Sequence, residues 1–372
     1  MTASIRLTMI VRDESATIER AIASVLPVIS SWRIIDTGSV DDTIERVRSA
    51  LTAVPGEMRE SRWTDFAVNR SELVTWASDG TSDDDWLLLL DADMTIDFDP
   101  DLTDRLTQHE GDAALVEVLG GVRYRMPYLV RANRRWHYVG RTHEFLSSNE
   151  PFVTARFDAL RVIHHADGGS RGQKFERDLE LLTASLAENP DDPRSLFYLA
   201  QTQRDRGEHA AARELYRRRA DLGGWDEEVF VARLQQGVME HELGMPEAGE
   251  TLQEAWELRP TRAEPLYHLA RINRLRRRHH LAWMFANLAV SVPRPDDVLF
   301  VEDWVYLWAS RFEMADAAWR IGESALAARI CHELLGEGGL PDDHRDHLEY
   351  VLTRLDEQGP GTLGEPAPGS NG

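Results

Sequence analysis

Short apolar runs alternate with amphipathic stretches in the first part of the chain. Three apolar runs predict β-strands, at residues 5–11, 32–35 and 86–90. Three amphipathic stretches predict helices, at residues 15–25, 41–51 and 66–77. This alternation is typical of a mostly parallel sheet packed between helices. Two further β-rich segments, at residues 113–130 and 156–163, predict a smaller mixed-sheet region beside it.

The pattern becomes helix-rich and strand-poor after about Lys174. Leu and Ala recur on either side of glycine turns at Gly207 and Gly244, and again around residues 266–270. A helix, a glycine turn and a second helix form the unit of a tetratricopeptide (TPR) repeat. We therefore expect an α/β domain at residues 1–180, a TPR-like all-α domain at 181–357, and a disordered Pro/Gly-rich tail at 358–372.

Composition narrows the class of protein. A length of 372 residues is compatible with two domains, and the formal net charge of −22 opposes a nucleic acid or an anionic membrane as partner. Cys331 is the only cysteine, which excludes an intrachain disulfide and a cysteine zinc cluster. The start of the chain lacks a signal-peptide pattern, and no apolar run reaches the roughly 18 residues of a membrane span. We therefore expect a cytoplasmic protein.

Two carboxylates follow the buried strand at residues 86–90. Asp91 and Asp93 are separated only by Ala92, so the strand should carry them to the carboxyl edge of the sheet, where open α/β sheets bind ligands. Hard oxygen ligands at that edge suit a divalent cation that carries phosphates. The alternative is an ordinary solvated strand end.

Two other loops offer groups for the same ligand. Asp36 ends the second strand and Gly38 permits a tight turn, so Asp36 is a candidate acceptor for a base or ribose; an ordinary loop is the alternative. Arg70, near the start of a helix, could hold two diphosphate oxygens with its forked donors or could be a surface arginine.

Titratable residues gather in two later segments. Glu144 is the best candidate for a general base, with His143 beside it, although both could simply form a turn. His164 and His165 precede an Asp-Gly-Gly loop and could supply an imidazole to the metal bound by Asp93. Lys174 could face an anion, or it could lie on a solvated helix face.

Taken in order, these pieces resemble family 2 glycosyltransferases of the GT-A fold, over roughly residues 4–180. More specifically, the chain looks like the subgroup that fuses this domain to TPR-like helices. The matching pieces are residues 9–14, 36–39, 66–71, 90–94, 136–144 and 165–178. Two positions depart from the family pattern: Glu144 replaces the Asp of widely studied members, and Met94 replaces the Glu that often follows Asp-X-Asp.

The resemblance implies a hexosyltransferase-type, inverting transfer from a UDP-type nucleotide sugar, dependent on Mn²⁺ or Mg²⁺. It implies that Asp93 binds the metal, with His165 favoured over His164 as second ligand, and that Glu144 or His143 is the base. The residues implied to bind the nucleotide sugar are Val11, Arg12, Glu14, Asp36, Gly38, Arg70, Asp91, Ala92 and Lys174. The acceptor could be a peptide, a saccharide, a lipid-linked precursor or a small metabolite, and the helical repeats could contact a peptide or form a homodimer.

Two other functions are compatible with the sequence. The first is a noncatalytic scaffold, in which a degenerate sugar-nucleotide domain carries a protein-binding repeat array. The second is a sugar nucleotidyltransferase, which we rank last because residues 11–15 contain no glycine for a phosphate loop.

Overall fold

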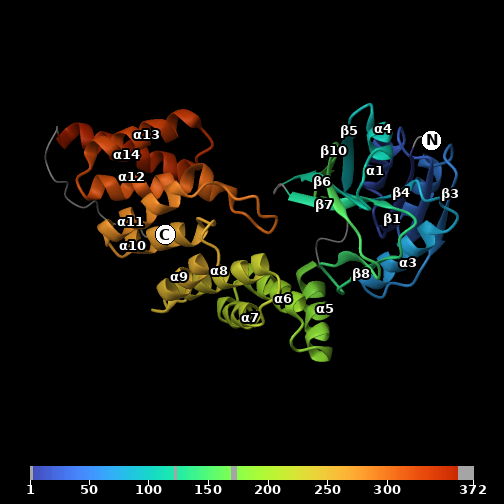
Figure 1. The fold of residues 1–372 in the computed structure, drawn as a ribbon, viewed down its shortest axis with the longest axis horizontal. Coiled ribbons are helices and arrows are strands. Elements are labelled where there is room, and N and C mark those ends of the chain that lie inside the picture. The colour runs from blue at the N-terminus through green and yellow to red at the C-terminus, as the bar shows by residue number, and fades with distance from the viewer. Residues whose placement is uncertain (1–2, 121–123, 169–173, 359–372) are drawn as a thin grey trace. The chain divides into compact units, whose positions relative to one another are not determined.

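The computed structural model describes residues 3–120, 124–168 and 174–358, without the side chains of residues 174, 175 and 358. It divides into two compact units, Met1–Ser195 and Leu196–Gly372, each described by itself below (Figure 1). The structure confirms a mixed α/β region followed by a helical repeat region.

The first unit is built around an eight-stranded sheet with the order β3-β2-β1-β4-β7-β6-β10-β5. The strands are β1 (Ser4–Val11), β2 (Ser31–Asp36), β3 (Gly56–Glu60), β4 (Asp85–Leu89), β5 (Met94–Phe98), β6 (Ala113–Leu119), β7 (Tyr124–Arg131) and β10 (Thr154–His164). Strands β3, β2, β1 and β4 are mutually parallel, and β10 runs parallel to β6. Strand β7 is antiparallel to β4 and β6, and β5 is antiparallel to β10. The hairpin of β8 (Trp136–Val139) and β9 (Phe145–Ser148) forms a separate small sheet.

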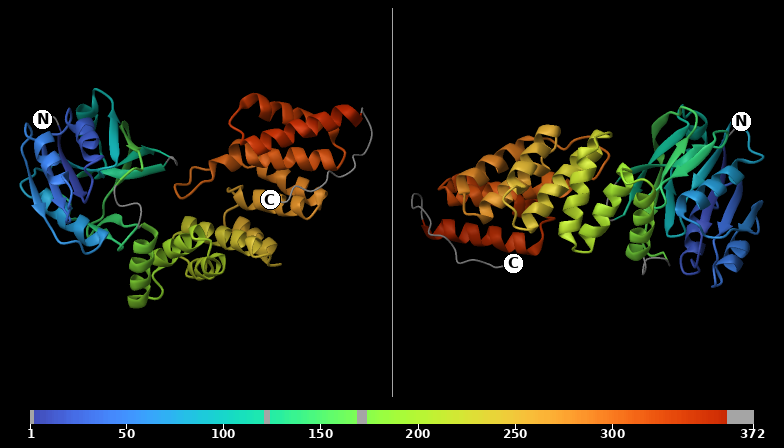
Figure 2. Two further views of the ribbon diagram at one scale, coloured as in Figure 1. Left: turned by 180° about the vertical axis from the view of Figure 1, so that it is seen from behind. Right: turned by 90° about the horizontal axis from the view of Figure 1, so that it is seen from below.

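Helices pack on both faces of this sheet. They are α1 (Ile18–Val25), α2 (Thr43–Ala50), α3 (Phe66–Ser78) and α4 (Leu102–Thr107), and α5 (Lys174–Glu188) follows the last strand. Trp86 and Leu88 of β4 join the core formed with α1, α2 and α4, whereas Leu87 and Leu89 join the core formed with α3. Both faces of β4 are therefore buried, which explains why its sequence is continuously apolar. Figure 2 shows the strands between helices from two further directions.

The structure contains elements that the sequence analysis missed. Edge strand β3 is almost entirely exposed, so it carries no apolar alternation. Strand β5 has only three buried residues before Asp97, and α4 is only six residues long. The hairpin β8–β9 buries Trp136 but leaves most of its other side chains partly exposed. In each of these elements the apolar pattern is too short or too weak to be recognised.

The second unit is a succession of helices that pack against their neighbours in the chain. They are α6 (Pro193–Asp205), α7 (His209–Asp221), α8 (Asp226–Glu242), α9 (Ala248–Leu258), α10 (Glu264–Leu275), α11 (His279–Ser291), the π-helical η2 (Val305–Ala309), α12 (Ser310–Arg320), α13 (Ser324–Glu337) and α14 (Asp342–Gln358). The division between the units falls in the first turn of α6.

Left-handed residues end the first helix of each hairpin in this unit. Gly207, Gly244 and Gly322 have φ values of +80°, +70° and +91°. Arg277 takes the same place between α10 and α11 with φ +55°. Since glycine adopts positive φ without steric cost, the three glycines are the residues expected at a helix C-terminus and Arg277 is the exception.

Within the described residues, no helix is long and apolar enough to cross a membrane. The predicted disordered tail lies outside the described residues, apart from its first position, Gln358.

Candidate active site

Three parallel strands bring the predicted acidic residues to one edge of the sheet. Asp36 is the last residue of β2 and is in register with Val11, the last residue of β1. On the other side of β1, β4 ends at Leu89, and Asp91 and Asp93 follow at once. The carboxyl ends of β2, β1 and β4 therefore lie side by side, as expected for a ligand site of an open α/β sheet.

Asp36 is engaged by its own loop. One carboxylate oxygen accepts the backbone N–H groups of Gly38 and Ser39, each at 2.9 Å, and the other accepts the Ser39 hydroxyl. Gly38 has φ +107°, the conformation that this tight turn requires. The Asp36 side chain is only 1% exposed, so a contact with a nucleoside would have to be added to these three bonds.

Arg70 lies between two carboxylates that the sequence places far apart. Its Nη2 donates to Asp91 Oδ1 at 2.7 Å, and its Nε forms a 2.7 Å ion pair with Glu144 Oε1 that is not aligned as a hydrogen bond. Helix α3 packs against β8, and Ser71 Oγ accepts the Tyr138 N–H at 2.8 Å, which brings the Glu144 loop to Arg70. The forked donors of Arg70 therefore bind protein carboxylates in this structure, rather than being free for a diphosphate.

Burial and neighbouring charges have opposing effects on the pKa values of Arg70 and Glu144. Burial alone would lower the pKa of Arg70, but the negative charges of Asp91 and Glu144 raise it above its ordinary value. For Glu144, burial raises the pKa, and Arg70 offsets only part of this rise. A buried carboxylate with a raised pKa is a stronger base than an ordinary surface glutamate.

Asp93 contacts the His164 ring. The Nε2 of His164 lies 3.2 Å from Asp93 Oδ2. The antiparallel pairing of β10 with β5 sets His164 opposite Met94, the residue that follows Asp93. The sequence favoured His165 as the partner of Asp93, but the His165 ring bonds to Thr95 Oγ1 at 2.9 Å, and only its backbone N–H reaches Asp93, at the carbonyl oxygen. The two rings therefore have different partners, and only the His164 ring contacts the Asp93 carboxylate.

The loop after β10 approaches Asp93 closely. A Cβ added to Gly168 would lie 3.3 Å from Asp93 Oδ2. Burial alone would raise the pKa of Asp93, but hydrogen bonds from His164 and from the Gly168 backbone lower it. Asp93 is therefore held as an anion next to an imidazole.

His143 has a different partner from its neighbour Glu144. Its Nε2 lies 3.8 Å from Asp178 Oδ2, and Thr142 Oγ1 donates to Asp178 Oδ1 at 2.8 Å. His143 has φ +51°, and Arg194 Nε donates to its carbonyl oxygen at 2.8 Å. Asp178 on α5 thus anchors the loop from which Glu144 projects toward Arg70.

The remaining candidates contribute in different ways. Val11 and Ala92 are buried, and the Val11 carbonyl oxygen already accepts the Thr37 N–H at 3.0 Å, whereas Arg12 is half-exposed next to the same edge. Glu14 accepts the Thr17 hydroxyl at 2.8 Å and so helps start α1. The Lys174 side chain lies outside the described residues.

Sequence reasoning missed the roles of Thr95, Gly168 and Asp178. No local signal distinguishes Thr95 and Asp178, because their partners in space are separated from them by a strand pairing or a long loop. Only the Asp-Gly-Gly sequence that contains Gly168 hinted at a close backbone approach.

The metal prediction can be compared with the donor atoms present. Within the described ranges, which omit residues 169–173 beside this loop, no group of three His, Cys, Asp or Glu side chains converges on a possible cation position. Asp93 and His164 offer one oxygen and one nitrogen donor. Two protein ligands fit a cation that shares the rest of its coordination with substrate phosphates, but not an all-protein metal cage.

Comparison with known proteins gives limited information. No protein-family model matches the chain. A TPR repeat-containing protein of Synechococcus elongatus is 29% identical over 210 residues, which cover 51% of this chain and 50% of that protein. The chain therefore spans about half the length of the curated relative that it matches.

Two solved structures share low similarity with the chain. A thermophilic TPR protein of Thermus thermophilus is 20% identical, covers 48% of this chain and 91% of its own, and has a TM-score of 0.31. Residues 1–349 of S. aureus TarS, solved in complex with UDP, are 10% identical, cover 65% of this chain and 92% of their own, and have a TM-score of 0.35. TM-scores this low support no argument about fold or function.

Proposed function

We propose that the chain is an inverting glycosyltransferase that moves a sugar from a UDP-type nucleotide sugar to an acceptor nucleophile. The resemblance of residues 4–180 to family 2 glycosyltransferases suggests the reaction. The observation that carries the proposal is the meeting of Asp91, Arg70 and Glu144 at the sheet edge where Asp93 and His164 also meet.

Glu144 is the proposed base. Because its pKa is raised by burial, it can accept a proton from the acceptor group as that group attacks the sugar. Arg70 holds this carboxylate and Asp91 in fixed positions, which limits the reorganisation needed during reaction. His143 remains the alternative base, although Asp178 is its partner in this structure.

Asp93 and His164 are the residues proposed to hold a Mn²⁺ or Mg²⁺ ion, with His165 as the alternative ligand. Such an ion, when bound, would neutralise charge developing on the leaving diphosphate. The carboxylate and the imidazole are already 3.2 Å apart, so little rearrangement of these side chains is needed for both to bind one cation.

The experiment is a thermal-shift screen of the full chain with UDP-sugars, with Mn²⁺ or with a chelator. A UDP-sugar that binds the folded state raises the melting temperature by mass action, and this rise should require the metal. Asp93→Asn should abolish the metal-dependent rise and reduce transfer about 100-fold or more, because cation stabilisation is worth several kcal/mol. The matched control is Asp97→Asn, which removes an exposed carboxylate from the same segment and should change neither result.

A noncatalytic scaffold is the second candidate, and the helical repeat unit favours it because such arrays form extended binding surfaces. It predicts no stabilisation by any UDP-sugar and no metal-dependent hydrolysis of UDP-sugars by the purified protein. If the wild type shows either the stabilisation or the hydrolysis, and Asp93→Asn does not, the scaffold is contradicted.

A further inference from the structure

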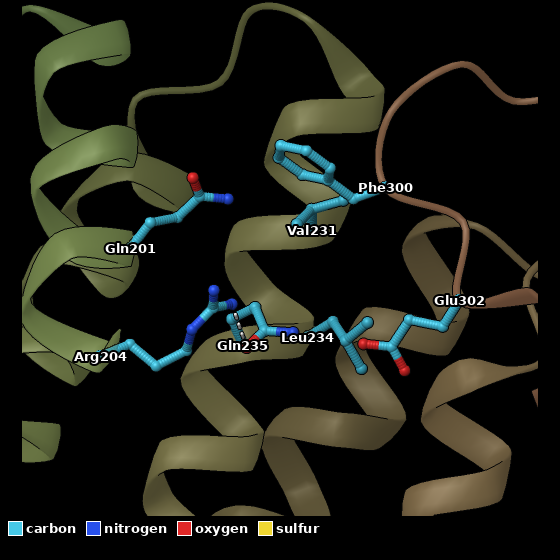
Figure 3. Close-up of a pocket in the computed structure, with 7 residues that line it drawn as sticks. All are labelled: Gln201, Arg204, Val231, Leu234, Gln235, Phe300 and Glu302. Carbon is cyan, nitrogen blue, oxygen red and sulfur yellow. Dashed lines mark hydrogen bonds between the residues drawn. The ribbon is translucent and has the colours of Figure 1, made fainter. Parts of the chain in front are cut away.

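A cavity of about 290 Å³ lies within the second unit (Figure 3). Three elements form its wall: α6, α8 and the segment that joins α11 to η2. The lining residues are Gln201, Arg204, Val231, Leu234, Gln235, Phe300 and Glu302. Residues three or four apart on each helix share one face, so the side chains of α6 and α8 line the cavity together.

The segment that carries Phe300 is held in a strained conformation. Phe300 has φ +43°, a value that bulky residues rarely adopt. Arg262 Nη2 donates to the Phe300 carbonyl oxygen at 3.1 Å, and Glu227 Oε2 accepts the N–H groups of Val298 and Leu299 at 2.9 and 2.8 Å. Strain of this kind persists only where surrounding contacts enforce it, and it is concentrated at functional positions.

Glu302 brings an unsatisfied carboxylate to the same cavity. Its backbone N–H donates to Glu264 Oε1 at 3.2 Å, but its side-chain Oε2 is buried and has no hydrogen-bond partner among the described residues. The nearest basic atom is His268 Nε2, at 3.9 Å. Burial lowers the pKa of His268 to about 3, so this ring is neutral and forms no ion pair with Glu302. Because Oε2 has almost no accessible surface, a ligand in the cavity would contact Glu302 at the 24% of its side chain that stays exposed.

The other charged group of the cavity is already balanced. Arg204 Nε donates to Asp205 Oδ1 at 2.9 Å, and Arg204 Nη1 donates to Gln235 Oε1 at 3.3 Å, the bond drawn in Figure 3. An anionic ligand would have to compete with Asp205 for Arg204. At Glu302 a cationic ligand would meet no charged basic group of the described residues within ion-pair distance, although Arg262 and Arg204 offset part of the negative charge from farther away.

Size and polarity limit the cationic ligand further. The apolar side chains of Val231, Leu234 and Phe300 suit a hydrocarbon stem, and Glu302 suits a charged head. A volume of about 290 Å³ is at the small end for a ligand site, enough for one long side chain. The net charge of −22 also attracts a basic partner over longer distances.

We propose that this cavity receives a lysine or arginine side chain from an extended segment of a partner polypeptide. The ammonium or guanidinium group donates to Glu302, and the stem of the side chain lies against Val231, Leu234 and Phe300. The proposal does not depend on sugar transfer by the first unit.

The test uses α-blocked amino-acid amides and the full chain. N-acetyl methylamides of lysine, arginine, norleucine and glutamate are titrated at about pH 8 while the amide NMR signals of residues 231–235 and 300–302 are followed. Burial, with Glu264 adding to it and Arg262 and Arg204 opposing it, raises the pKa of Glu302 to about 7, so Glu302 is ionised at this pH and lysine is still charged. The lysine or arginine compound should bind about tenfold or more tightly than the norleucine compound, which keeps a similar stem without the charge.

Two variants make the test specific. Glu302→Gln should abolish the advantage of the basic compounds, and it should fold because glutamine keeps the size and shape of this partly exposed side chain. Glu257→Gln removes an exposed carboxylate from α9 of the same unit and should leave the advantage unchanged. The proposal is overturned if no basic compound gives a saturable shift, if norleucine binds equally well, if the glutamate compound is preferred, or if Glu302→Gln keeps the advantage.

Discussion

Arg70 determines how two carboxylates from distant parts of the chain behave. Without its positive charge, Asp91 and Glu144 would lie close together as like charges in a poorly solvated place. With it, Glu144 remains a base whose raised pKa reflects burial rather than repulsion alone. The arginine that the sequence assigned to a diphosphate therefore acts first on the protein's own side chains.

This arrangement predicts the pH dependence of the proposed transfer. A general base must be deprotonated, so the rate falls as the pH decreases through the pKa of Glu144. Because that pKa is raised, the acid limb of kcat/KM should lie above the 4.5 of an ordinary glutamate. Glu144→Gln should reduce kcat/KM by about 10²–10⁴-fold and remove this limb, while UDP binding stays unchanged.

Glu150→Gln, which removes an exposed carboxylate after β9, is the matched control and should behave like the wild type. Wild-type rates in Glu144→Gln, together with a large loss in His143→Gln, would transfer the role of base to His143.

At the scale of elements, the repeat turns show what a local pattern can specify. Glycines at positions 207 and 244 predicted turns between helices, and the structure confirms positive φ at both, as it also shows at Gly322. Arg277 fills the equivalent place with the same bonding: its N–H donates to Arg274 O at 2.9 Å, as the Gly244 N–H donates to His241 O at 2.9 Å. A side chain in the left-handed region costs about 1–2 kcal/mol, so this turn is less stable than it could be.

Arg277→Gly should therefore stabilise the second unit. Removing the steric cost outweighs the extra flexibility of glycine in the unfolded chain, for a net gain of about 0.5–1 kcal/mol in the free energy of unfolding. Arg276→Gly is the matched control: Arg276 has φ −82°, so glycine there relieves no strain and should destabilise slightly. Urea unfolding followed by circular dichroism measures both, and a loss of stability in Arg277→Gly would contradict the argument.

Pairings between distant elements could not be predicted from the sequence. The buried strand before Asp91 and the helix of Arg70 were predictable, because each has a strong local pattern. Strand β5 has no such pattern, so its pairing with β10, which brings His164 and His165 close to Asp93, could not be predicted. The side-chain orientations then determine that the His164 ring contacts the Asp93 carboxylate. The contact between Arg70 and Glu144 likewise follows from the packing of α3 against β8, which no local spacing encodes.

At the scale of the whole molecule, each unit has its own apolar core. Buried residues such as Leu88 belong to clusters of the first unit, and residues such as Leu252 belong to clusters of the second. A unit with a separate core can unfold as a separate cooperative transition.

Calorimetry of the full chain should therefore resolve two transitions. Leu88→Ala should lower the melting temperature of one transition only, and Leu252→Ala that of the other. Each should reduce the free energy of unfolding of its own unit by about 2–5 kcal/mol, because both side chains are fully buried. A UDP-sugar with Mn²⁺ should raise the melting temperature of only the transition that Leu88→Ala affects. One shared transition, moved equally by both variants, would show that the units unfold together.

The separation of 71 positions between Asp93 and His164 has a consequence for biosynthesis. A growing polypeptide carries the aspartate long before the histidine leaves the ribosome, and the two meet only when the final strand of the sheet docks against β5. Such a late, long-range closure is slow compared with the formation of local helices. The incomplete chain thus contains the Asp93 carboxylate without the His164 imidazole. Any property that needs both groups arises only when β10 has joined the sheet.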